Sequence, residues 1–302
     1  MRRRFEQERR KEVEEEKTYF INPEKVQELA EFINPIICRV GRELNELHPD
    51  LPIFQGYPRL RVEEYKSIIP EDQFRKDLEL AYEMRKERSP LSLKQTKKGE
   101  IKVKRENKLG FLGEELLTTI WWKFLRRTEG KENFIIVLCA EPDDEKGIDN
   151  LIVSPKEGIL CSSDDTTVPV SSERFREKSK QIIARNIREK GVQIRYGIKF
   201  KDNKINKTRL EGVPEFYWVV HPDLVLRAPR FLDPNLDNIG PYEAEILDAI
   251  CGSSLYQAMR IQEALQKEKA RVEDQKTQEF LERIQKAYKF FAKFQKMAHE
   301  FS

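Results

Sequence analysis

The chain has 302 residues and a net charge of +3; 36% of its residues are charged and 38% are hydrophobic. The hydrophobic residues are clustered and periodic, which excludes a disordered chain, and no apolar run is long enough to span a membrane. The N-terminus is rich in Arg and Glu rather than apolar residues, so we expect a soluble, cytoplasmic protein without a signal peptide.

The cysteines of the chain argue against a disulfide or zinc framework. All four, at positions 38, 139, 161 and 251, stand far apart and form no Cys-x-x-Cys pair. This spacing favours a reducing compartment. Cys139 and Cys161 fall in apolar segments, where we expect buried free thiols.

Residues 1–106 are predicted to form a helical N-terminal region. A first helix begins after Asn22, and Pro35 is expected to kink or divide it. Pro and Gly punctuation predicts a loop over residues 48–58, and a second helix follows over about 70–87. The basic segment 94–108 is expected to be a linker or an exposed hairpin that ends this region.

Residues 107–235 are predicted to form an α/β core. One broad apolar face predicts the first helix, a continuous apolar run predicts the first strand, and alternation predicts later strands. The expected elements are a helix over 110–127, a strand over 134–140, an acidic turn over 141–145, a strand headed by Asp149, a strand over 158–163, a helix over 173–190, and strands over 192–200, 215–220 and 224–226.

Residues 236–302 are predicted to be a C-terminal helical region with a break at Gly252. Apolar residues from Phe280 to Phe301 recur at steps of four and three, which is heptad spacing. Phenylalanine is bulky for a slim coiled coil. This face is therefore expected to pack across the body of the domain or against a second subunit.

Carboxylates gather at the ends of the predicted core elements. Glu114 lies on the rim of the first helix, Asp149 heads a strand, and Asp164 or Asp165 ends the next strand. Oxygen ligands in such an arrangement can bind Mg²⁺. The simpler alternatives are a first-turn helix acid for Glu114 and an ordinary turn residue for Asp149. The nearby acids Glu115, Asp143 and Asp144 are expected to be solvated.

The strings Gly113-Glu114, Gly147-Ile-Asp149 and the strand from Gly158 to Ser163 resemble the PD-(D/E)XK nuclease superfamily, which includes many type II restriction endonucleases. The resemblance covers about residues 107–228. It implies a restriction-endonuclease-like mixed sheet flanked by helices, here with helical N- and C-terminal additions. It also implies Mg²⁺ held by Asp149, Asp164 and Asp165, assisted by Glu114.

The chain departs from this family at one position. The family's usual Glu-x-Lys is replaced here by Ser162-Ser163-Asp164-Asp165, so the catalytic lysine is missing. Some members relocate a catalytic residue to the following helix, where Lys178 or Lys180 can supply the ammonium and Glu177 a carboxylate. Alternatively, the activity has been lost naturally, or the lysine has been removed by an introduced substitution.

The helix that follows presents cations at regular spacing. Phosphate contacts suit such a stripe, although most charge runs are solvated faces. The string Ser172-Glu173-Arg174 is similar to one in restriction enzymes that read CCGG-centred sites, which implies base contacts from Glu173 and Arg174. The polar stripe consists of Arg174, Lys178, Gln181, Arg185 and Arg188.

The sequence therefore predicts a Mg²⁺-dependent, restriction-like endonuclease that hydrolyses phosphodiester bonds in double-stranded DNA. A homodimer is expected from the C-terminal heptad and from the need to cut two strands. The alternative is a catalytically inactive nuclease-fold protein that binds DNA or assembles a complex. A helical scaffold with an incidental α/β insert is a third interpretation.

Overall fold

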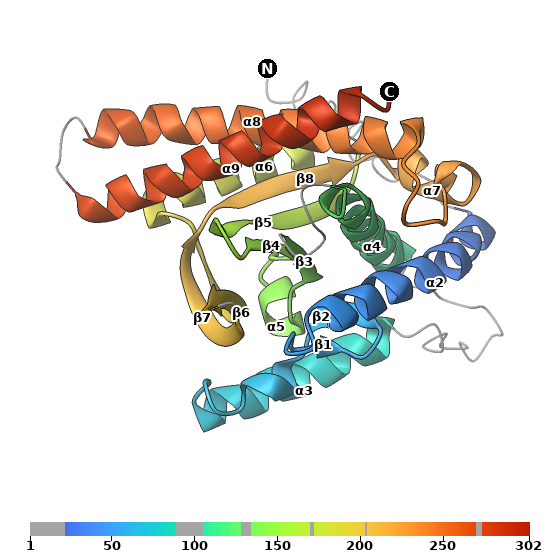
Figure 1. Cartoon of the computed structure of the whole chain (residues 1–302), viewed down its shortest axis with the longest axis horizontal. Coiled ribbons are helices and arrows are strands. Elements are labelled where there is room, and N and C mark those ends of the chain that lie inside the picture. The colour runs from blue at the N-terminus through green and yellow to red at the C-terminus, as the bar shows by residue number, and fades with distance from the viewer. Residues whose placement is uncertain (1–21, 89–104, 128–133, 170–171, 203, 270–273) are drawn as a thin grey trace, which may run out of the picture.

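The computed structural model describes residues 22–88, 105–127, 134–169, 172–202, 204–269 and 274–302. Its centre is a six-stranded mixed sheet in the order β1-β2-β3-β4-β5-β8, flanked by helices (Figure 1). The predicted α/β class and the mixed sheet flanked by helices are confirmed.

The middle of the chain builds most of this sheet. Strands β3, β4 and β5 pair antiparallel in chain order, and β8 pairs parallel to β5 after the crossover helix α6. The bounds are α4 (Arg105–Leu125), β3 (Ile135–Leu138), α5 (Glu141–Asp144), β4 (Asn150–Ser154), β5 (Gly158–Thr167), α6 (Glu173–Glu189) and β8 (Glu215–Val220). The strand β5 is longer than expected, so Asp164 and Asp165 lie inside it.

Two predictions in the second half of the core need correction. The predicted strand from Val192 exists as β6 (Val192–Lys201), but it pairs with β7 (Lys204–Val213) in a separate two-stranded sheet. The strand expected over 224–226 is wrong, because α7 (Pro222–Phe231) occupies it. Pro222 stands in the first helical turn, where its missing N–H group costs nothing, and His221 caps the helix.

The N-terminal region contributes strands as well as helices. The loop predicted over 48–58 contains β1 (Ile53–Phe54) and the start of β2 (Tyr57–Leu60), which pairs parallel to β3. This region is therefore not helical throughout. Helix α2 (Pro23–Leu47) runs through Pro35 without dividing. The short helix η1 (Val62–Tyr65) and helix α3 (Glu71–Arg88) complete the region.

The linker predicted over 94–108 lies mostly outside the described residues, and the described part of the chain resumes at Arg105 with α4.

The C-terminal helices pack along the sheet. Helix α8 (Pro241–Lys269) is continuous through Gly252, so the predicted break is wrong. In α9 (Gln275–His299), Phe291 contacts the rings of Phe216, Trp218 and Trp121. The heptad face thus packs against the body of the domain, which is one of the two arrangements expected.

The two faces of the sheet are covered by different helices. Trp218 of β8 stacks on Trp121 of α4, whereas the neighbouring Tyr217 stacks on Phe175 of α6. Successive residues of a strand point to opposite faces. Helices α4 and α9 therefore cover one face, called here the α4 face, and α6 covers the other, called the α6 face.

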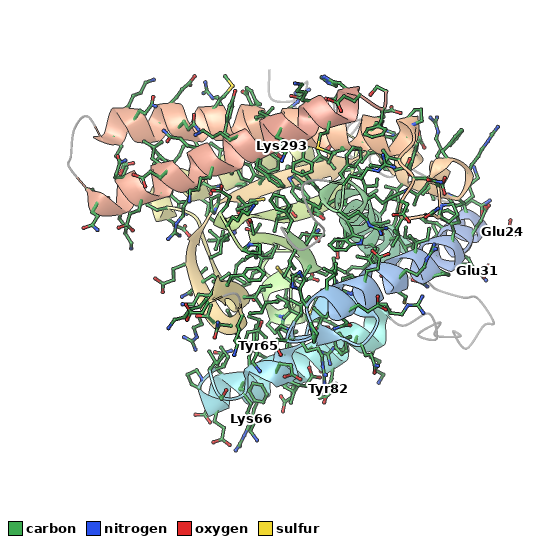
Figure 2. All side chains as sticks on the ribbon, in the orientation of Figure 1. Glu24, Glu31, Tyr65, Lys66, Tyr82 and Lys293 are labelled. Carbon is green, nitrogen blue, oxygen red and sulfur yellow. The ribbon has the colours of Figure 1, made fainter. Side chains whose placement is uncertain are left out.

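Side chains fill the space between these layers (Figure 2). Tyr65, labelled there, donates a hydrogen bond to the carbonyl of Gly197 and so ties η1 to β6. Cys139 and Cys161 are buried free thiols, as predicted. None of the helices in the described ranges is long and apolar enough to cross a membrane.

Candidate metal centre

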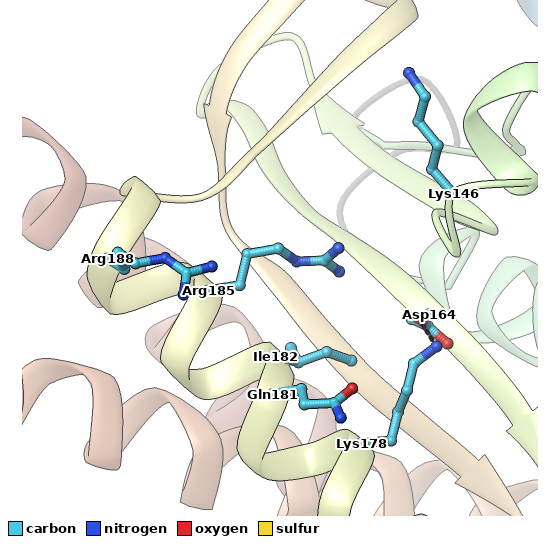
Figure 3. Close-up of a pocket in the computed structure, with 7 residues that line it drawn as sticks. All are labelled: Lys146, Asp164, Lys178, Gln181, Ile182, Arg185 and Arg188. Carbon is cyan, nitrogen blue, oxygen red and sulfur yellow. Dashed lines mark ion pairs between the residues drawn. The ribbon is translucent and has the colours of Figure 1, made fainter.

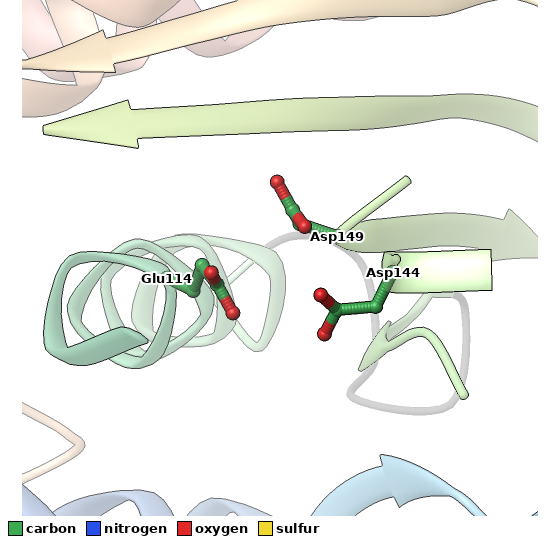
Figure 4. A group of neighbouring side chains, drawn as sticks. All are labelled: Glu114, Asp144 and Asp149. Carbon is green, nitrogen blue, oxygen red and sulfur yellow. The ribbon is translucent and has the colours of Figure 1, made fainter. Parts of the chain in front are cut away.

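Three carboxylates from separate elements converge on the α4 side of the sheet. Glu114 of α4 faces Asp144 of α5, and Asp149 lies beside both just before β4 (Figure 4). One ligand oxygen of each lies within 4.8 Å of the others. Each residue is at most 8% exposed, so the cluster is largely withdrawn from solvent. We call these residues the three-carboxylate cluster.

The turn before β4 fixes Asp149. The backbone N–H of Asp149 donates to the Ser163 carbonyl, and its own carbonyl accepts from Cys139, each at 2.7 Å. Gly147 adopts a φ of +79°, a conformation that favours glycine, and lets the chain reverse between Asp144 and Asp149. Backbone hydrogen bonds to the residue that follows β3 and to β5 therefore hold Asp149 from both sides.

A buried cation lies against the cluster. Arg59 of β2 is 4% exposed, and its Nη1 atom lies 2.6 Å from Asp144 Oδ2. Its Nη2 atom lies 3.6 Å from Glu114 Oε2, and Nη1 also donates to the Cys139 carbonyl at 2.9 Å. Arg59 offsets part of the negative charge of the cluster.

Burial and the remaining negative charge raise the pKa values of two carboxyl groups of this site, those of Asp149 and Asp165. Burial raises the pKa of Asp149 well above its usual range, and the charges of Glu114 and Asp144 raise it further. Burial also raises the pKa of Asp165 to about 8. Both shifts show that burial opposes negative charge here, and a bound cation would relieve that opposition.

The donor set fits a hard divalent cation. Three carboxylates offer oxygen ligands, which Mg²⁺ prefers. Around an octahedral Mg²⁺, neighbouring ligand oxygens are about 2.9 Å apart and opposite ones about 4.2 Å, whereas the three carboxylate oxygens lie within 4.8 Å of one another. Because Mg²⁺ usually keeps several water ligands, the residues present fit such an ion if side-chain rotation or a bridging water makes up the difference.

The two aspartates of β5 point to opposite faces of the sheet. Asp165 accepts a hydrogen bond from Asn150 Nδ2 at 2.5 Å, and Asn150 in turn accepts from Thr118 of α4. Asp164 instead lies 2.7 Å from Lys178 Nζ of α6. Asp165 is therefore next to the three-carboxylate cluster, where its N–H donates to Asp149, and Asp164 is on the α6 face.

The structure brings together some of the predicted ligands and separates others. Glu114 and Asp149 meet as expected. Of the two alternatives on β5, the structure places Asp165 beside the cluster and Asp164 on the α6 face. Lys178 contacts Asp164 rather than the cluster, and Lys180 is exposed on α6. Glu177, the other candidate on α6, is also exposed.

The acids expected to be solvated are not. Asp144 joins the cluster, and Asp143 is buried, where it accepts hydrogen bonds from the backbone N–H groups of Arg195 and Tyr196. Glu115 is half-buried and accepts from Tyr57. The one-turn helix α5 turns Asp143 and Asp144 inward, and no periodicity in so short a segment predicts that.

Four residues of the polar stripe of α6, Lys178, Gln181, Arg185 and Arg188, line a cavity of about 210 Å³ on the α6 face (Figure 3). Arg185 pairs with Glu215, a buried carboxyl group whose pKa is raised by burial to about 7. Lys146 extends away from the other side chains drawn in Figure 3. The lining residues are Lys146, Asp164, Lys178, Gln181, Ile182, Arg185 and Arg188.

The two predicted base-contacting residues lie at the start of α6. Glu173 is exposed there, next to Ser172, whose side chain caps the helix. Arg174 is in the first turn, and its side chain is outside the part of the structure that is described.

Comparison of the chain with protein-family models, with curated proteins and with solved structures finds no match in any of the three.

Proposed function

We propose that this protein is a Mg²⁺-dependent endonuclease of the PD-(D/E)XK type that hydrolyses phosphodiester bonds in duplex DNA. The observation that supports it most is the convergence of Glu114, Asp144 and Asp149 beside the start of β4. Two of these residues are the ones that the family resemblance implies, and they come from the helix and the strand where the family has them.

The order of elements supports a restriction-endonuclease-like fold. Helix α4, three antiparallel strands, the crossover helix α6 and a strand parallel to β5 follow one another. Strand β8 takes the place expected for the strand from Val192, and the hairpin of β6 and β7 is inserted before it. This topology keeps the predicted order once the hairpin is set aside.

Glu114, Asp144 and Asp149 are the residues that would hold the ion. A divalent cation there would neutralise charge on a phosphate oxygen and lower the pKa of a water molecule, which are the needs of phosphodiester hydrolysis. Asp165 would remain beside this set and fix Asp149 through its backbone N–H group. Within the described residues, β5 has no lysine beside Asp165.

The α6 face supports DNA as the substrate. Cations of α6 that were predicted to contact phosphates line one cavity together with Lys146. Lys178 in this cavity is paired with Asp164, which lies next to the Gly147 turn of the metal centre. A phosphate backbone on this face would therefore lie beside the Gly147 turn, with β5 between it and the three-carboxylate cluster.

Cleavage assays test the enzyme directly. Pure protein is incubated with varied plasmid DNA and Mg²⁺, and the variants Asp149→Asn and Asp72→Asn are compared. Asp72 is an exposed aspartate of α3, so its variant is a matched control for the loss of one carboxylate. We expect discrete fragments from the wild type and from Asp72→Asn, and none from Asp149→Asn.

Binding assays test the DNA surface separately. Lys146 and Arg188 are exposed at the cavity. Changing both to alanine should weaken duplex binding and reduce the slope of log affinity against log salt concentration by about two. Lys180→Ala removes an exposed cation of the same helix outside the cavity lining. Fluorescence anisotropy at several salt concentrations should show little change for Lys180→Ala; equal losses for both variants would contradict this surface.

The second candidate is a nuclease-fold protein that binds DNA without cutting it. The observation that favours it is Arg59, which already pairs with two of the three carboxylates. Salt-sensitive DNA binding with no cleavage in Mg²⁺ or Mn²⁺ would support this candidate over the enzyme. No DNA binding at low salt would exclude both.

A homodimer remains part of the proposal because a duplex has two strands to cut. The heptad no longer supports it, since Phe291 and Phe294 pack against Trp121 within the chain. Sedimentation that shows a monomer at micromolar concentration would remove this part. The free state of all four cysteines supports a cytoplasmic location.

A further inference from the structure

A permanently charged guanidinium lies where the three-carboxylate cluster needs compensation. Arg59 comes from β2, a strand outside the segment that resembles the nuclease family. It contacts Asp144 and Glu114 while its Nη1 atom also donates to the Cys139 carbonyl. Pairing of Arg59 with Leu138 fixes its backbone beside β3.

The contacts of Arg59 with the two carboxylates are compatible with a metal contact at the same carboxylates. A carboxylate has two oxygens and several lone pairs, so contact with one N–H group does not exclude a metal contact. The planar guanidinium has its donors in a fixed fork, which sets the orientation of the groups it meets. Arg59 is thus suited to hold two metal ligands without taking their place.

The net charge of the cluster also supports a role for Arg59 beside a divalent cation. With its three carboxylates ionised and Arg59 included, the group has a net charge of −2, which one divalent cation neutralises. The lysine that reaches β5 in this structure, Lys178, is on the opposite face of the sheet with Asp164. Arg59 is therefore the better placed of the two to act on the metal ligands.

We infer that Arg59 is a positioning residue of the metal site, which orients Asp144 and Glu114 and supplies the fixed positive charge that Glu-x-Lys enzymes take from their lysine. This inference rests on the proposed function. Arg59 acts through the carboxylates rather than on the substrate.

Calorimetry on the full chain tests the inference without DNA. Mn²⁺ is titrated into the wild type, Arg59→Met, Arg59→Lys and Arg195→Met. Arg59→Met keeps an unbranched apolar side chain but removes the guanidinium group with its charge and N–H donors, and we expect Mn²⁺ to bind about 10- to 100-fold more weakly. Arg59→Lys keeps the charge and N–H donors but not the planar guanidinium, and its remaining contacts with the carboxylates should recover part of this loss.

The control removes a comparable ion pair elsewhere. The side chain of Arg195 pairs with the buried Asp77 of α3, and Arg195→Met keeps the backbone N–H bond to Asp143, so the variant should lower thermal stability but leave Mn²⁺ affinity unchanged. This variant shows whether a general loss of stability is enough to weaken the metal site.

A comparison of Mn²⁺ with Tb³⁺ separates the role of charge from that of structure. Removing the positive charge of Arg59 makes the site more negative and favours the trivalent ion, so the affinity ratio of Tb³⁺ to Mn²⁺ should rise by about tenfold in Arg59→Met. Arg59→Lys should keep the wild-type ratio. A purely structural role would weaken both ions alike.

The outcomes separate this inference from the proposed function. Wild type that binds Mn²⁺ and folded Arg59→Met that binds it equally well would overturn the role of Arg59 alone. If Arg59→Met does not fold, wild-type affinity in Arg59→Lys would overturn its orienting role. Wild type that binds no Mn²⁺ would overturn the metal site itself and the inference with it.

Discussion

Asp165 shows how strongly burial acts on a single carboxyl group of this site. Its side chain accepts from Asn150, and burial raises its pKa to about 8. In an unfolded chain an aspartate has a pKa of about 3.9. Between these pH values the folded protein keeps a proton that the unfolded chain releases, so stability falls as the pH rises from about 4 to about 8.

The first prediction concerns the removal of this titration. Asp165→Asn keeps an oxygen that can accept from Asn150 but has no proton to lose. We expect thermal melts in EDTA to show the variant more stable than the wild type at pH 7.5, with the difference shrinking towards pH 4. An equal difference at both pH values would show that ionisation of Asp165 is not its cause.

Asp164 and Asp165 also show why the sequence could not choose between these two aspartates. The strand was expected to end at Ser163, and beyond its end either aspartate could turn towards the metal. The structure continues β5 to Thr167, so the two side chains alternate between faces. Polar residues at 162–167 hide this extension, because they do not look like a buried strand.

At the scale of elements, the turn between α5 and β4 depends on a glycine. A Cβ atom at Gly147 would lie 2.5 Å from Asp164 Oδ2. Gly158 begins β5 with the same φ of +79°, but no atom lies within 4 Å of a Cβ built there. The two glycines share their backbone conformation and differ in their surroundings.

The second prediction uses this pair. Gly158→Ala should cost about 1–2 kcal/mol of unfolding free energy, the strain of a left-handed residue with a side chain. Gly147→Ala should cost about 3 kcal/mol or more, because it also displaces Asp164. Urea unfolding at pH 7 measures both, and equal losses would mean that the contact with Asp164 relaxes freely.

Much of the element order was predictable from the sequence. The apolar face of α4, the runs of β3 and β4 and the capped helix α6 all have local signals. The strand β2 has no local signal, because its four residues, Tyr57-Pro-Arg-Leu, contain a proline. It forms by pairing with β3, which lies far along the chain. The proximity of Glu114 and Asp149 was therefore predictable from the sequence, and that of Arg59 was not.

At the scale of the whole molecule, the site is assembled from distant parts of the chain. Its residues come from β2, α4, α5 and the turn before β4. Helix α2 supports them, because Leu29, Ile33 and Ile37 are fully buried and α2 packs on α4 and β2. The segment that resembles the nuclease family is thus completed by residues before it.

The third prediction follows from this dependence. A chain that begins at residue 107 loses α2, β1, β2 and α3, and exposes the buried face of α4. We expect it to lack a cooperative thermal transition and to be cut rapidly by trypsin, whereas the full chain melts cooperatively. A cooperative melt of the shortened chain would show that residues 107–302 form a core of their own.

The opposed aspartates of β5 have a thermodynamic consequence for the whole molecule. Asp164 lies against the Gly147 turn on the α6 face, and the backbone N–H of the next residue, Asp165, donates to Asp149 of the metal centre, so charges bound on the two faces would act on each other across one strand. A metal ion bound at the three-carboxylate cluster and a phosphate bound on the α6 face would then attract each other. By linkage, each would raise the binding affinity of the other by the same factor. Metal affinity should therefore rise with phosphate occupancy of the opposite face, which makes β5 a coupling element.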